Sequence, residues 1–90
     1  MFKIFIPSFL SQLEYDQFRA LAEDGDKLLV DLESYEKSVA TLGSTLESAG
    51  SFVVRGPLIL SDMVRWLKGK DYENIGKYRS LYYAEQARHF

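Results

Sequence analysis

In the first residues of the chain, Phe2, Ile4 and Ile6 alternate with Lys3 and Phe5. Apolar side chains recur at every second place from Phe2 to Ile6, which is the period of a half-buried β-strand. Pro7 follows, and proline cannot donate a backbone hydrogen bond to a sheet. The pattern predicts a strand that ends at Pro7.

Ser11 opens a helical pattern. Ser11 and Glu14 have the spacing of a capping box, in which the serine hydroxyl accepts from the amide three residues on and the glutamate reaches back. Apolar residues follow at helical spacing up to Leu21, and Gly25 is typical of a helix C terminus. These signals predict a helix over residues 12–24.

The next segment has the most regular apolar spacing in the chain. Asp26 can cap a helix, and steps of four and three then form the two seams of a heptad pattern. These positions are Leu28, Leu32, Tyr35, Val39, Leu42, Leu46 and Ala49. No proline interrupts the segment before Gly50, so we expect one continuous helix over residues 27–49. Its stripe is buried within the chain or, alternatively, forms the seam of a dimer.

Residues 52–60 contain two apolar runs that flank Gly56 and Pro57. A proline between apolar runs is typical of an edge strand. We expect this strand to pair with the N-terminal one. The alternative places Pro57 in the first turn of a helix.

Two further helices complete the pattern. Ser61 or Asp62 can cap a short third helix. Asp71 can cap a fourth, whose apolar residues from Ile75 to Tyr82 recur at helical spacing.

Together these elements predict an α+β fold that is mainly helical. It has four helices, one of them long, and a minimal two-stranded sheet from the N terminus and residues 52–60. With 90 residues, the chain is expected to form one compact domain over residues 1–90. The hydrophobic share of 47% and the aromatic share of 14% predict a packed core. Because small domains bury a small share of their surface, self-association or partner binding would add stability.

The two halves of the chain carry opposite charge. Residues 1–50 hold four cations and nine carboxylates, whereas residues 51–90 hold seven cations and four carboxylates. We expect the halves to fold on each other so that these charges offset at the surface. The alternative is two faces of opposite sign that attract a charged partner.

The sequence also bears on localisation and cofactors. The N-terminal segment has one cation and a short apolar run before Pro7, unlike a signal peptide, and no apolar run reaches the roughly 20 residues of a membrane span. We therefore expect a soluble, cytoplasmic protein with no membrane partner. The absence of cysteine excludes disulfides and thiolate metal sites. Asp24 and Asp26 resemble the start of a calcium loop, but Leu28 occupies the next ligand position, so no metal or other cofactor is expected.

The sequence contains few candidates for catalytic residues. His89 is the single histidine and lies next to the last residue, where a general base is rarely held in a fixed position. No serine has the surroundings of a nucleophile elbow. We expect no catalytic residue and no enzyme activity.

Aromatic and arginine side chains gather in the C-terminal half. Protein interfaces prefer these side chains, because they bury much area with little loss of rotamer freedom. The predicted interface consists of Trp66, Tyr72, Arg79, Tyr83, Arg88 and Phe90. Tyr83 is the expected anchor, since it lies off the apolar face of the last helix. The alternative is that these residues only border the core.

We expect a non-catalytic protein-interaction module that acts as an inhibitor, adaptor or regulatory subunit. Its partner would be another protein or, in a homodimer, a second copy of itself; small regulators encoded by phages have this size and character. The alternative is a nucleic-acid-associated regulator that uses the basic, aromatic C-terminal half. The net charge of −2 weakens that alternative, and a small enzyme is the least favoured reading.

Overall fold

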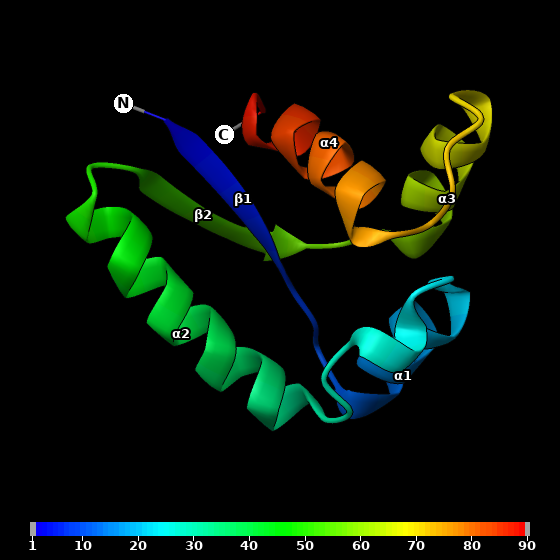
Figure 1. The fold of residues 1–90 in the computed structure, drawn as a ribbon, viewed down its shortest axis with the longest axis horizontal. Helices are drawn as coiled ribbons and strands as arrows, with labels where there is room; N and C mark the ends of the chain where they lie inside the picture. The colour runs from blue at the N-terminus through cyan, green and yellow to red at the C-terminus, as the bar shows by residue number, and fades with distance from the viewer. Residues whose placement is uncertain (1, 90) are drawn as a thin grey trace.

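Two parallel strands form the sheet. In the computed structural model, which describes residues 2–89, β1 (Lys3–Ser8) pairs with β2 (Phe52–Pro57), and Phe5 lies opposite Val54. β1 continues one residue past Pro7, which is tolerated because both strands of a two-stranded sheet are edge strands. Parallel strands need a long crossover connection, and two helices between β1 and β2 supply it (Figure 1).

The first of these helices, α1 (Gln12–Leu21), begins as predicted. The Ser11 hydroxyl accepts a hydrogen bond from the Glu14 amide at 3.2 Å. The helix ends at Leu21, three residues before the predicted end, and Gly25 instead opens a short 3-10 turn, η1 (Gly25–Lys27). A Cβ atom on Gly25 would meet the carbonyl oxygen of Arg19, so this close approach of two backbone segments requires glycine.

The long helix, α2 (Leu32–Ser48), starts five residues later than predicted. Asp31 caps it instead of Asp26, because the Asp31 carboxylate accepts from the Ser34 amide at 2.7 Å. The prediction of a continuously buried stripe is also wrong. Val39 is buried, but Leu42 is 48% exposed, because α2 lies beside β2 at one edge of the fold and few of its residues meet the rest of the chain (Figure 1).

The helix after the sheet, α3 (Leu60–Gly69), begins before both residues expected to cap it. Ile59 is at its N-cap, and no side chain caps it there. Ser61 and Asp62 therefore lie inside the first turn, where a carboxylate still suits the helix dipole. The strand interpretation of the preceding segment is correct, with the strand ending at Pro57.

The last helix, α4 (Gly76–Ala87), starts later than its predicted cap, Asp71. Asp71 instead adopts a left-handed backbone with φ of 59°. Asn74 fixes the turn that follows. Its backbone N–H donates to the Glu23 carboxylate at 2.7 Å, and its side-chain amide donates to the Leu21 carbonyl at 3.0 Å. These contacts to the end of α1 keep the turn out of helical geometry.

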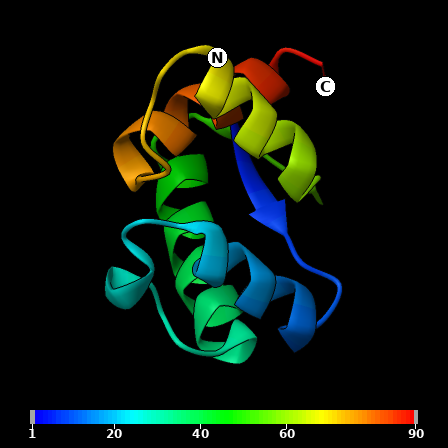
Figure 2. The ribbon, with the colours of Figure 1, turned by 90° about the vertical axis from the view of Figure 1, so that its right-hand side faces the viewer.

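The core lies between α1, α3 and α4. It is built from aromatic and aliphatic side chains: Phe9, Tyr15, Phe18, Leu58, Met63, Leu67 and Tyr82. Figure 2 shows α1 and α3 on the side facing the viewer, with α2 behind them. Over residues 2–89, the structure is thus the mainly helical α+β fold with four helices and a two-stranded sheet that the sequence predicts.

Ion pairs connect the acidic first half of the chain to the basic second half. Asp24 pairs with Arg79 at 2.8 Å, and Glu36 pairs with Arg55 at 3.0 Å. Both pairs join the two halves, as expected, but only the Glu36–Arg55 pair lies at the surface, because the Asp24 and Arg79 side chains are largely buried. Among the described residues, no helix is long and apolar enough to cross a membrane.

Candidate binding cavity

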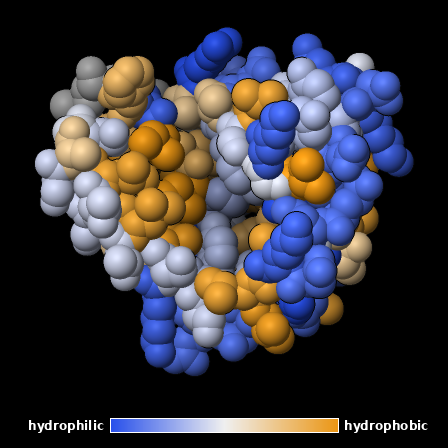
Figure 3. Space-filling view, in the orientation of Figure 1, coloured by the Kyte–Doolittle hydropathy of each residue, from blue (hydrophilic) through white to orange (hydrophobic). Residues whose placement is uncertain are grey.

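An open cavity of about 380 Å³ lies between α2 and α4. Strand β1, helix α1 and the segment between α1 and α2 complete its lining. Figure 3 shows a hollow in the middle of this face, with hydrophobic side chains gathered on one side of it. Pockets that take small ligands or side chains of partners typically measure about 300–1,000 Å³.

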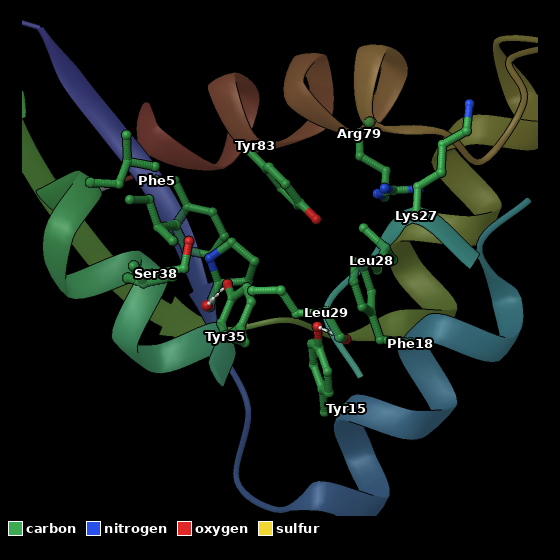
Figure 4. A pocket seen from close by; sticks show the side chains of 15 residues that line it. Phe5, Tyr15, Phe18, Lys27, Leu28, Leu29, Tyr35, Ser38, Arg79 and Tyr83 are labelled. Atoms are coloured by element: carbon green, nitrogen blue, oxygen red, sulfur yellow. Dashed lines mark hydrogen bonds between the residues drawn. The ribbon is translucent and has the colours of Figure 1, made fainter. Parts of the chain in front are cut away.

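The walls of the cavity are mainly apolar. β1 contributes Phe5, α2 contributes Val39 and Leu42, and the segment before α2 contributes Leu28 and Leu29. Figure 4 shows these segments converging on one space. Leu29 and Leu42 are 46% and 48% exposed, so the rim is apolar as well as the interior.

Three tyrosines from different elements bring hydroxyl groups to the cavity. Tyr15 donates to the Leu29 carbonyl at 2.6 Å, and Tyr35 donates to the Pro7 carbonyl at 2.6 Å. Burial raises the pKa of both side chains above the ordinary tyrosine range. Both hydroxyls are thus neutral at pH 7, and their protons are used to anchor the chain segments on either side of the cavity.

Tyr83 differs from the other two tyrosines. Its hydroxyl oxygen points from α4 into the cavity (Figure 4), and its ring lies 6.0 Å from the ring of Phe5. Burial raises the pKa of Tyr83 to about 12, although the neighbouring Arg79 guanidinium acts in the opposite direction. Within residues 2–89, no acceptor takes the Tyr83 hydroxyl proton.

Arg79 closes one end of the cavity. It is 3% exposed and donates to the two Asp24 carboxylate oxygens at 2.8 and 3.0 Å, to the Asn74 carbonyl at 2.9 Å and to the Asn74 side chain at 3.1 Å. Asp24 also accepts from the Gly76 amide at 3.0 Å. The hydrogen bond from Arg79 is the main cause that lowers the pKa of Asp24. This network fastens the connection between α1 and α2 to the start of α4.

The structure divides the predicted interface residues. Arg79 and Tyr83 meet at the cavity, whereas Trp66 and Tyr72 lie elsewhere, with ring centroids 6.0 Å apart. Arg79 was predicted as an interface residue, which would require it to be exposed, but it is 3% exposed and its guanidinium bonds to Asp24 and Asn74 inside the protein.

The remaining residues of the predicted interface differ in how far they are buried. Trp66, Tyr72 and Tyr83 are half-buried and pack against the core, as the alternative reading expected. Arg88 is exposed at the C-terminal end of α4, and Phe90 lies outside the described residues. The assignment of these side chains to a protein interface stays a prediction.

Most cavity residues were not singled out from the sequence as a site. Tyr35, Val39 and Leu42 belonged to the predicted core stripe, and Tyr15 belonged to the first helix. Their common setting depends on a parallel crossover that brings distant segments together. No local motif marks such a site.

The described residues contain no group of three or more histidine or carboxylate side chains placed to hold a metal ion. Comparison of the chain with models of protein families, with curated proteins and with solved structures finds no significant match.

Proposed function

We propose that this protein is a non-catalytic protein-interaction module whose cavity receives an apolar anchor side chain of a partner protein. The observation that carries the proposal is the open apolar cavity with half-exposed Leu29 and Leu42 at its rim. Interfaces concentrate binding energy where a large side chain of one protein fills a pocket of the other, surrounded by contacts that exclude water.

The polar groups of the cavity suit binding better than proton transfer. A general base works best with a pKa near the working pH, but burial raises the pKa of Tyr83 to about 12 and raises that of Tyr35 further. Arg79 donates hydrogen bonds to Asp24 and Asn74. The two tyrosine side chains therefore hold their protons at neutral pH, and they can orient a bound group.

Nucleic-acid binding has less support from the aromatic residues. Tyr72 and Tyr78 stack on each other with ring centroids 4.5 Å apart and planes 9° apart. Lys70 lies over the Trp66 ring and Lys77 over the Tyr78 ring. Bases bind such proteins by stacking on aromatic faces, and each of these three rings already has a stacked ring or a lysine against it.

A capture experiment with two matched variants tests the proposal. Leu42 and Leu81 are both 48% exposed on helices, but only Leu42 lines the cavity. A partner protein retained from a cell lysate by the wild type and by Leu81→Asp should be lost with Leu42→Asp. Equal retention by both variants would show that the partner binds elsewhere.

A further inference from the structure

The charged groups that line the cavity are both cationic. They are Lys27 and Arg79, and no carboxylate lines it among the described residues. Asp24, which does not line the cavity, offsets the charge of Arg79. Lys27 forms no ion pair with any carboxylate of the described residues, so the cavity has a local excess of positive charge in a chain whose net charge is −2.

One hydrogen-bond donor in the cavity, the Tyr83 hydroxyl, remains without an acceptor among the described residues. The protons of Tyr15 and Tyr35 are taken by backbone carbonyls, whereas the proton of Tyr83 has no acceptor in the described part of the chain. Figure 4 shows the Tyr83 hydroxyl beside Arg79 and facing the cavity, with Lys27 on the other side of Arg79. A bound group that brings an acceptor to this end of the cavity would satisfy the unpaired donor.

We infer that the occupant of the cavity is the C-terminal residue of a partner chain, with its apolar side chain inside and its carboxylate held by Tyr83 and Lys27. The inference rests on the proposed function, since it names the chemistry of the anchor that the same cavity receives. A terminal carboxylate is anionic, accepts several hydrogen bonds and lies directly next to a side chain, which combines the two properties that the cavity requires.

The geometry allows both parts to bind together. The apolar side chain would lie against Phe5, Val39 and Leu42, which line the floor and the α2 wall. The carboxylate would lie at the α4 end, where Tyr83 donates directly. Lys27 is exposed at the rim. Its ammonium points away from Tyr83 in Figure 4, and rotation about its flexible four-carbon stem would turn it towards a bound anion.

Two matched probes test this inference by NMR titration of the intact chain. N-acetyl-phenylalanine carries a carboxylate like that of a C-terminal residue, whereas N-acetyl-phenylalaninamide has the same ring and a neutral amide. The amide signals of cavity residues should shift with both probes, and the acid should bind about tenfold more tightly, as expected for a hydrogen bond to a charged group. Tyr83→Phe and Lys27→Gln should each reduce the preference for the acid, while Lys77→Gln, outside the cavity, should leave it unchanged.

The outcomes separate this inference from the proposed function. Equal affinity for the two probes, with shifts at the cavity, would overturn the carboxylate assignment and leave the apolar anchor in place. A preference for the acid that survives in both Tyr83→Phe and Lys27→Gln would also overturn it. Absence of cavity shifts with either probe would contradict the proposed function itself.

Discussion

Arg79 and Asp24 form a two-point ion pair, with nitrogen to oxygen distances of 2.8 and 3.0 Å. The side chains are 4% and 17% exposed, so this is a largely buried contact. It joins the end of α1 to α4 and fixes the segment that forms one wall of the cavity. The pair therefore connects the stability of the fold to the shape of the candidate site.

Removal of the carboxylate should destabilise the protein strongly. Asp24→Ala leaves the Arg79 guanidinium buried without its counterion, which typically costs about 3–5 kcal/mol. Chemical denaturation measures the change in unfolding free energy. Glu33→Ala is the control, because Glu33 and Lys37 form an exposed pair at 3.3 Å whose loss should leave the midpoint nearly unchanged. Equal small effects of both variants would show that the buried pair is not structurally important.

Acid should weaken the fold through the same contact. The hydrogen bond from Arg79 lowers the pKa of Asp24 in the folded state, so between the folded and unfolded pKa values the unfolded chain binds more protons. Stability is then fully present above the unfolded pKa of about 3.9 and is lost as the pH falls through the folded pKa. Denaturation measured from pH 6 down to pH 2 should show a shallower acid loss for Asp24→Ala than for the wild type. Parallel curves would contradict this assignment.

The packing of α2 can be tested with a pair of aspartate variants. Val39 is buried, whereas Leu42 is 48% exposed beside the cavity. Val39→Asp buries a charge and should cost about 3 kcal/mol or more, while Leu42→Asp should cost less than about 1 kcal/mol. Thermal melts of the two variants provide the comparison. If Leu42→Asp unfolds the protein, α2 packs more deeply than described.

Two glycines should respond to alanine in opposite directions. A Cβ atom on Gly25 would meet the Arg19 carbonyl oxygen, whereas one on Gly43 meets nothing within 4 Å. Gly25→Ala should cost about 1–3 kcal/mol through overpacking. Gly43→Ala should stabilise α2 by about 0.5–1 kcal/mol, because alanine loses less backbone entropy in a helix. Stabilisation by Gly25→Ala would contradict the backbone path around η1, and destabilisation by Gly43→Ala would contradict the open space beside Gly43.

The sequence predicted those elements whose signals are local. Ser11 caps α1 because its hydroxyl reaches an amide three residues away. The N-terminal apolar residues form β1 as predicted, although Phe2 lies outside the strand and Phe5, Ile6 and Pro7 are buried in succession rather than alternately. The start of α2 was predicted wrongly because Leu28 continues the apolar spacing although it lies before the helix. Leu28 is partly buried against the core from a non-helical segment, and the spacing of apolar residues alone cannot distinguish the two settings.

The candidate site could not be predicted for a related reason. The helical spacing of the last segment singles out Tyr83, but it gives no sign that Phe5, Tyr15 and Tyr35 line the same cavity, because the parallel fold brings these segments together. The burial of Arg79 likewise depends on Asp24, which lies 55 residues away in the chain. Contacts over such separations have no signature in a single sequence.

The most direct test of the proposed binding cavity is to locate a bound apolar anchor by NMR. The measurement is the set of intermolecular nuclear Overhauser effects between the ring of N-acetyl-phenylalaninamide and the isotope-labelled protein. The account predicts contacts from the ring to the side chains of Phe5, Val39 and Leu42, which line the cavity. Contacts to the Trp66 and Tyr72 cluster in their place, or no contacts at saturating probe, would contradict it.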